Sequence, residues 1–297
     1  MQRSIATVSL SGTLPEKLEA IAAAGFDGVE IFENDLLYYD GSPSEIRKRC
    51  ADLGIAITLF QPFRDFEGCR RDRLQRNIDR AERKFDLMQE LGTDLVLVCS
   101  NASADSVGDE RILLDDLSLL AEHAGRRGLR IGYEALAWGR HVFDHRDVWS
   151  IVEQVDHPHI GIILDSFHSL SRKIPSESIR EIRGDKIVFV QLADAPLLDM
   201  DLLYWSRHFR NMPGEGDLPV VEFARAVAAI GTAGAAISRD TSALPDLVAA
   251  HREYLRMLNI AMAGGAPGPD GQQASVLFDC VLVGVQSDGH GCVAKGP

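Results

Sequence analysis

Three residues with oxygen-bearing side chains lie at the ends of apolar runs. Glu134 ends the run IGYE, Asp165 ends IGIILD, and Gln191 comes near the end of KIVFVQL. Runs this apolar are typical of strands that are buried on both faces. Two carboxylates and an amide oxygen are ligands that hard divalent cations such as Mg²⁺ or Mn²⁺ prefer. If the strands are parallel, their C-terminal ends share one edge, and the sequence predicts a cation site there.

His168 follows Asp165 by three residues, which places its imidazole near the same strand end. Imidazole titrates close to neutral pH, so His168 suits proton transfer as well as metal ligation. Simpler interpretations of these polar residues stay open. A carboxylate after a strand can cap the next helix or pair with an arginine, and this histidine can lie on a surface loop.

Three further residues could bind an anionic or hydroxylated substrate. Arg64 follows the predicted third strand, and Ser206 and Arg210 lie in WSRHFRNMPGEGDLP, which is predicted to be a long loop. A guanidinium group offers a planar pair of donors that matches a carboxylate. Salt bridges with acidic residues nearby in the sequence are the alternative for each arginine.

Segments of strand and helix character alternate between residues 4 and 230. The expected strands are 4–10, 28–32, 55–60, 94–99, 130–134, 160–165 and 186–192. The expected helices are 14–24, 44–53, 71–91, 111–127, 146–155, 176–183 and 220–230. With a weak eighth unit at 235–238 and 247–262, this order predicts an α/β fold, a (β/α)8 TIM barrel. A doubly wound sheet is the alternative, but SLSGTLPEKL lacks its glycine-rich phosphate loop.

Residues 1–262 are therefore expected to form one barrel domain, and residues 263–297 a linker and a poorly defined tail. The segment GGAPGPDGQQ has the composition of a linker. The glycine-rich end of the chain is too short to bury a core of its own.

Charge and composition exclude several classes of protein. The net charge is -13 at pH 7, which argues against a nucleic-acid partner, because phosphates select basic surfaces. The five cysteines form no C-x-x-C pair, as in proteins of a reducing cytoplasm. We find neither a signal peptide nor an apolar run long enough to span a membrane. The sequence predicts a cytoplasmic protein without a membrane partner.

Five motifs occur in order along this framework: QPFRDFEG, YEALAWGRH, LDSFHSL, FVQLADAP and WSRHFRNMPGEGDLP. Through them the chain resembles the xylose-isomerase-like sugar phosphate isomerase and epimerase barrels, and among these the bacterial 3-dehydroshikimate dehydratases. The resemblance implies a barrel that binds one divalent metal and is a lyase. Its reaction eliminates water from 3-dehydroshikimate to give protocatechuate, in quinate and shikimate catabolism. Longer members carry a second domain that resembles 4-hydroxyphenylpyruvate dioxygenase.

The resemblance also implies roles for individual residues. The implied ligands of the metal, which is Mg²⁺ or Mn²⁺ with Co²⁺ as a further option, are Glu134, Asp165 and Gln191. His168 would lie beside the substrate, and Arg210 and Ser206 would bind its carboxylate or hydroxyl groups. Arg64 is a looser inference from its motif. The implied partner is a small carboxylated ring, no other cofactor is expected, and homo-oligomer formation stays open.

The resemblance fades from Thr232 onward. The eighth strand of the family reads approximately G-x-x-G-P-L-S-L-E-I-F-N-D, and its Glu completes the metal site, whereas this chain has Arg239 there. Arginine cannot ligate a cation, and Asp240, one residue later, would point to the other face of a strand. We hypothesise that this segment has been replaced or is read in another frame, which the coding DNA would test.

Two alternatives to a dehydratase therefore stay open. A keto-sugar isomerase or epimerase would use the same barrel and the same enolate chemistry. A pseudoenzyme or binding protein would follow if loss of the fourth ligand at Arg239 abolishes metal binding.

Overall fold

A computed structural model describes residues 2–230 and 283–286 of the chain. The strands are β1 (Gln2–Ala6), β2 (Gly28–Phe32), β3 (Ala56–Phe63), β4 (Leu95–Cys99), β5 (Arg130–Glu134), β6 (Ile160–Asp165), β7 (Ile187–Leu192) and β8 (Val283–Gln286). The α-helices are α1 (Leu14–Ala23), α2 (Glu33–Leu37), α3 (Pro43–Leu53), α4 (Leu74–Leu91), α5 (Glu110–Arg126), α6 (His145–Val155), α7 (Ser166–Ser171), α8 (Leu202–His208) and α9 (Val220–Ile230).

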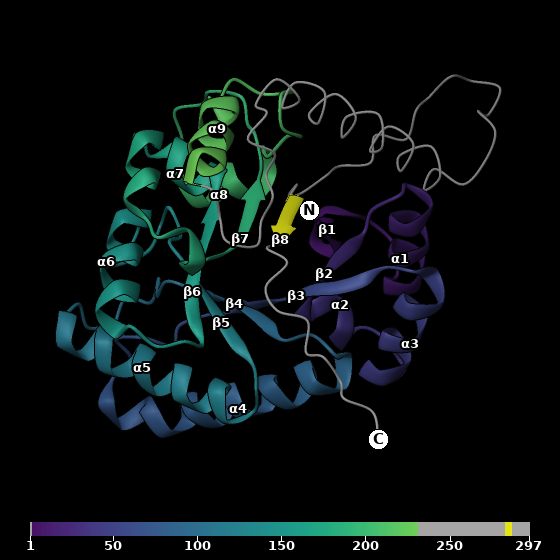
Figure 1. Cartoon of the computed structure of the whole chain (residues 1–297), viewed down its shortest axis with the longest axis horizontal. Coiled ribbons are helices and arrows are strands. Elements are labelled where there is room, and N and C mark those ends of the chain that lie inside the picture. Colours follow the sequence, from purple (N-terminus) through teal and green to yellow (C-terminus); the bar gives the residue numbers. More distant parts are fainter. Residues whose placement is uncertain (1, 231–282, 287–297) are drawn as a thin grey trace.

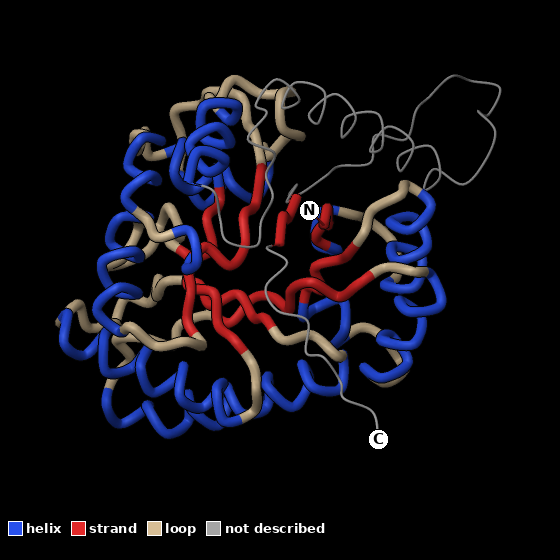
Figure 2. Tube along the Cα trace, in the orientation of Figure 1, coloured by secondary structure: helices blue, strands red, loops and turns tan. Residues whose placement is uncertain are grey.

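Within the described residues the strands close into a barrel in the order of the sequence, and the helices surround it (Figures 1 and 2). Neighbouring strands from β1 to β7 are parallel. β8 fills the remaining gap and runs antiparallel to both β7 and β1. The predicted TIM barrel is confirmed.

Most predicted elements agree with the structure, and the differences fall on the ends of two strands and on short helices. The third strand continues to Phe63, three residues beyond its predicted end. The first strand ends at Ala6 and gives way to a 3-10 turn at Thr7–Ser9, and residues 176–181 form a 3-10 helix instead of an α-helix. The predicted long loop contains α8, while α2 and α7 were not predicted. These helices have five to seven residues, too few to show an apolar repeat.

The predicted eighth unit at 235–238 and 247–262, Arg239 included, lies outside the described residues. β8 comes instead from the segment that was predicted to be a tail. The domain boundary at residue 262 stays a prediction.

Strand residues alternate between two apolar layers. In β4, Leu95, Leu97 and Cys99 belong to a small cluster inside the barrel. Val96 and Val98 belong to the larger core between the strands and the helices. This period of two decides which polar side chains enter the barrel, because residues of one parity point inward along each strand.

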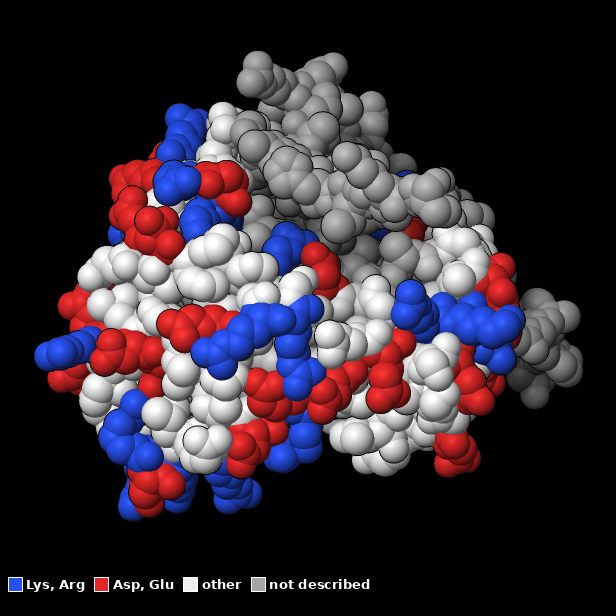
Figure 3. Space-filling model, turned by 60° about the horizontal axis from the view of Figure 1, so that its bottom comes forward, with Lys and Arg blue, Asp and Glu red and all other residues white. Residues whose placement is uncertain are grey.

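The surface of the described residues carries both signs of charge. On the face shown in Figure 3, basic and acidic side chains are interspersed, so the net negative charge is not gathered into one acidic patch there. None of the described helices has both the length and the apolar character needed to cross a membrane.

Glu67, in the loop after β3, links that loop to the end of β4 and to β5 by hydrogen bonds. Its carboxylate accepts hydrogen bonds from the Asn101 backbone amide, after β4, and from the Tyr133 hydroxyl on β5. Its second oxygen, Oε2, is buried with no hydrogen-bond partner among the described residues. Burial raises the pKa of Glu67 to about 8. The side chain is therefore predominantly protonated at pH 7.

We predict that Glu67→Gln weakens the dependence of stability on pH. The pKa of Glu67 is about 8 in the folded state against an ordinary value of 4.5. Between these values the folded protein holds a proton that the unfolded chain has released, so its contribution to stability is lost as the pH rises. In Glu67→Gln the free energy of unfolding should therefore fall less steeply with rising pH, by up to ~1.4 kcal/mol per pH unit. Urea unfolding of both proteins between pH 5 and pH 8 measures it, and equal slopes would contradict the prediction.

Candidate active site

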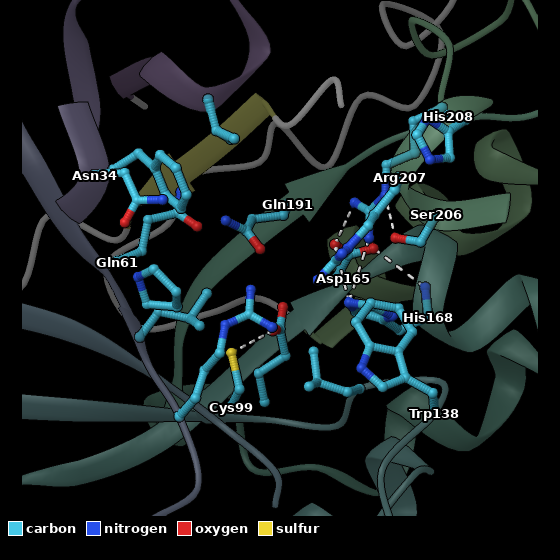
Figure 4. Close-up of a pocket in the computed structure, with 18 residues that line it drawn as sticks. Asn34, Gln61, Cys99, Trp138, Asp165, His168, Gln191, Ser206, Arg207 and His208 are labelled. Atoms are coloured by element: carbon cyan, nitrogen blue, oxygen red, sulfur yellow. Dashed lines mark hydrogen bonds and ion pairs between the residues drawn. The ribbon is translucent and has the colours of Figure 1, made fainter. Parts of the chain in front are cut away.

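A cavity of about 410 Å³ opens at the C-terminal ends of the strands (Figure 4). All the site residues predicted from the sequence line it: Arg64, Glu134, Asp165, His168, Gln191, Ser206 and Arg210. Their arrangement follows from strand register. Glu134 is paired with Cys99 of β4, and Asp165 with Gln191 of β7. Side chains from the ends of neighbouring strands therefore enter one space.

Glu134, Asp165 and His168 form a buried group that could hold a metal ion. One ligand atom from each lies within 4.8 Å of the other two. Glu134 Oε1 is buried and has no hydrogen-bond partner among the described residues. A buried oxygen without a donor is costly, and a cation would satisfy it. The residues present therefore fit a divalent ion with oxygen and nitrogen ligands.

Asp165 both caps the next helix and pairs with an arginine, the two simpler roles expected of a carboxylate after a strand. Its Oδ1 accepts from the His168 backbone amide at 3.2 Å and so caps α7, and its Oδ2 accepts from Arg210 Nη1 at 2.7 Å. Burial opposes ionisation, but the positive charge of Arg210 keeps the pKa of Asp165 below its ordinary value. Asp165 is therefore ionised, and its oxygens retain lone pairs for a further ligand.

Glu134 lies in a different environment from Asp165. Burial, and then the negative charge of Asp165, raises the pKa of Glu134 well above its ordinary value. Cys99 Sγ lies 3.8 Å from Glu134 Oε2 and is a weak donor. Two carboxylates this close cannot both ionise without added positive charge, which a bound cation would supply.

His168 is held with one ring nitrogen facing the protein and the other facing the cavity. The Ala137 backbone amide donates to Nδ1 at 3.1 Å. Nε2 lies 3.3 Å from Arg210 Nη2 and 3.8 Å from Asp165 Oδ2. Burial lowers the pKa of His168 to about 3, against the opposing effect of Asp165. The ring is therefore neutral at pH 7. Because Nδ1 accepts from Ala137, the proton of the neutral ring lies on Nε2.

Arg210 and Ser206 come from the segment that contains α8. Arg210 Nε donates to Ser206 Oγ at 3.1 Å, and the guanidinium lies 4.6 Å from the centre of the Phe167 ring. The chain after α8 is held by Asp194, whose backbone pairs with Asn211 and whose carboxylate accepts from two amides further along. These contacts hold Arg210 over Asp165 at the cavity wall.

Arg64 lines the same cavity from an exposed position after β3. It forms no ion pair with another residue of the described part of the chain, so its guanidinium is available to an anion. The sequence interpretation did not single out Asn34, Gln61, Cys99 and His208, which also line the cavity.

Glu30 of β2 was also missed, although it is fully buried inside the barrel. Burial raises its pKa to about 8. The signal was present in GVEIF, where a charged residue interrupts an otherwise apolar strand between Val29 and Ile31.

The fold and the site identify the class of protein. The family described as "Xylose isomerase-like TIM barrel" matches residues 18–258, and the chain belongs to this family.

More specific relatives match most of the chain. A protein named 3-dehydroshikimate dehydratase from Pseudomonas putida is 74% identical over 234 residues, which is 79% of this chain and 37% of that protein. One of the same name from Pseudomonas aeruginosa is 67% identical over the same shares of both chains. A solved xylose isomerase-like TIM barrel/4-hydroxyphenylpyruvate dioxygenase fusion protein matches with a TM-score of 0.77 and 74% identity, over 78% of this chain and 37% of that one. The chain thus spans little more than a third of these relatives.

We predict that Mn²⁺ raises the thermal unfolding midpoint of the wild-type protein and not that of Asp165→Asn. A ligand that binds only the folded state at 100 times its Kd adds about 2.7 kcal/mol of stability. The amide in Asp165→Asn removes a charge from the group that could hold the ion. Asp144→Asn is the matched control, because Asp144 also caps a helix and pairs with an arginine, but at α6. Equal Mn²⁺ shifts in all three proteins would contradict this assignment.

Proposed function

We propose that this chain is a metal-dependent 3-dehydroshikimate dehydratase, a carbon–oxygen lyase that forms protocatechuate and water. The observation that carries the proposal is 74% identity over 234 residues to a protein of that name. The cavity with Glu134, Asp165 and His168 beside Arg210 supports it. Because the chain spans 37% of that relative, the proposal concerns the reaction of the barrel alone.

The proposed substrate is a ring that bears one carboxylate, a ketone and hydroxyl groups. Arg210 would bind the carboxylate, since its guanidinium lies at the cavity wall and presents paired donors. Ser206 keeps an acceptor and a donor for a hydroxyl group beside it. Arg64, after β3, adds positive charge to the lining of the cavity.

The reaction breaks a C–H bond next to the ketone and a C–O bond on the ring. Glu134, Asp165 and Gln191 would hold the divalent ion, which as a Lewis acid polarises the ketone oxygen. His168 is the proposed acid/base residue. In this role its own proton would lie on Nδ1, which requires release of the Ala137 contact, so that Nε2 accepts the carbon-bound proton and returns it to the departing hydroxyl. Water leaves, and aromatisation of the ring makes the overall reaction favourable.

We predict that His168→Ala lowers turnover at least about 100-fold, the usual contribution of a general acid or base, and spares Mn²⁺ content. Ultraviolet absorbance of the aromatic product and metal analysis of the purified protein measure the two effects. His145→Gln is the matched control: His145 is also buried, but its ring lies between the Ser169 and Ser178 hydroxyls, away from the cavity. Full turnover in His168→Ala would refute its role, and loss of Mn²⁺ would make it a ligand instead.

A panel of 3-dehydroshikimate and keto sugars separates the proposed reaction from its alternatives. Conversion of a keto sugar without an aromatic product would identify an isomerase or epimerase. The variant Arg239→Glu tests whether a glutamate at this position, which lies outside the described residues, restores metal binding. If the wild-type protein binds no Mn²⁺ and Arg239→Glu does, the chain lacks the dehydratase activity in its present form.

A further inference from the structure

Glu30 lies inside the barrel, directly beneath the cavity, and no step of the proposed reaction uses it. It belongs to β2, and its side chain is fully buried. The neighbouring residues Val29 and Ile31 pack outward into the core beneath the helices. By the period of a strand, Glu30 therefore points toward the barrel axis.

One oxygen of Glu30 receives two side-chain amides. Gln61 Nε2, from β3, donates to Glu30 Oε2 at 2.8 Å, and Gln191 Nε2, from β7, donates to the same oxygen at 2.7 Å. The other oxygen, Oε1, accepts from Ser4 Oγ at 3.4 Å. Glu30 thus joins β2 to a residue that is 161 positions away in the sequence.

This contact decides which end of the Gln191 amide faces the cavity. A side-chain amide has a donor end and an acceptor end. Oε2 of Glu30 accepts from Gln61, so a proton on the carboxyl group would lie on Oε1. A Gln191 amide turned the other way would therefore bring two acceptor oxygens together. The oxygen of Gln191 must then face away from Glu30. Figure 4 shows the nitrogen of Gln191 on the side of Gln61 and its oxygen turned into the cavity.

We propose that Glu30 is a positioning residue that holds the side-chain amide of Gln191 with its oxygen toward the cation site. The proposal rests on the proposed function, in which Gln191 is a metal ligand. Partners that orient a ligand commonly change metal affinity by 10- to 100-fold when they are mutated, although they do not touch the ion. Gln191 is 1% exposed, and its amide nitrogen donates to a protein group, Glu30 Oε2.

Two conservative variants separate the reach of the acceptor oxygen from the kind of group that carries it. Glu30→Asp keeps the carboxyl group but withdraws it by one methylene group from Gln191. Glu30→Gln replaces the carboxyl group by an amide that keeps an oxygen at the same reach, with its NH₂ toward Ser4 Oγ. In calorimetric titrations with Mn²⁺ we expect Glu30→Asp to bind about 10-fold more weakly than wild type and Glu30→Gln to bind like wild type. Equal binding by Glu30→Asp and wild type, or equally weak binding by both variants, would overturn the proposal.

Two further variants test whether shortening any buried carboxylate weakens Mn²⁺ binding, or only shortening the one that contacts Gln191. Glu67→Asp shortens another buried carboxylate, whose partners Asn101 and Tyr133 lie outside the cavity, and it should leave Mn²⁺ affinity unchanged. In a Gln191→Ala background, Glu30→Asp should cause no further loss, because Glu30 acts through Gln191. The same 10-fold loss in that background would refute the positioning role.

A measurement without metal keeps this proposal distinct from the proposed function. The NH₂ protons of Gln191, observed by NMR, should exchange slowly in wild type and Glu30→Gln and faster in Glu30→Asp. If wild type binds no Mn²⁺ but the exchange rates follow this order, the function fails and the amide orientation stands. If the rates are equal in all three proteins, the orientation fails whatever the metal result.

Discussion

The site depends on the burial of two carboxylates from adjacent strands. Glu134 and Asp165 enter one cavity where little water reaches them, and the charge of each disfavours ionisation of the other. In the structure Arg210 neutralises Asp165, and Glu134 keeps an oxygen without a partner. Positive charge is therefore required at this place. Arg210 supplies part of it, and a bound cation would supply the rest.

The barrel meets this requirement through the period of its strands. Inward positions carry Leu95 and Leu97 lower in the barrel and polar residues at its mouth. Glu134 and Asp165 are both buried, and the low exposure strengthens the interactions between charges there. The same parity that buries leucine therefore places glutamate and aspartate beside each other. A shift of one residue in any of these strands would turn its ligand toward the helices.

Local features of the sequence predicted much of the fold and the site. The strand ends at Glu134 and Asp165 were predicted to the residue, because long apolar runs that end in a single polar residue leave little choice of boundary. The lining residues Arg64, Ser206 and Arg210 were also found from their motifs.

Long-range contacts set the limit of that prediction. The role of Glu30 was not predicted, because its partner Gln191 is 161 residues away in the sequence and only closure of the barrel brings the two together. The helix α8 escaped it because a single two-turn segment shows no periodicity. Pairing of Asp165 with Arg210 was one of two open alternatives, and only the path of the chain after α8 decides it.

The antiparallel strand β8 has a consequence for the behaviour of the chain in solution. A sheet that stopped at β7 would leave β7 and β1 as edges, each with a row of free backbone donors and acceptors. Such rows pair readily with strands of other molecules and promote aggregation. Four residues, Val283–Gln286, cover both rows at once. A short strand, parallel or antiparallel, is sufficient for this protection. Backbone hydrogen bonding requires an extended chain but no particular side chain.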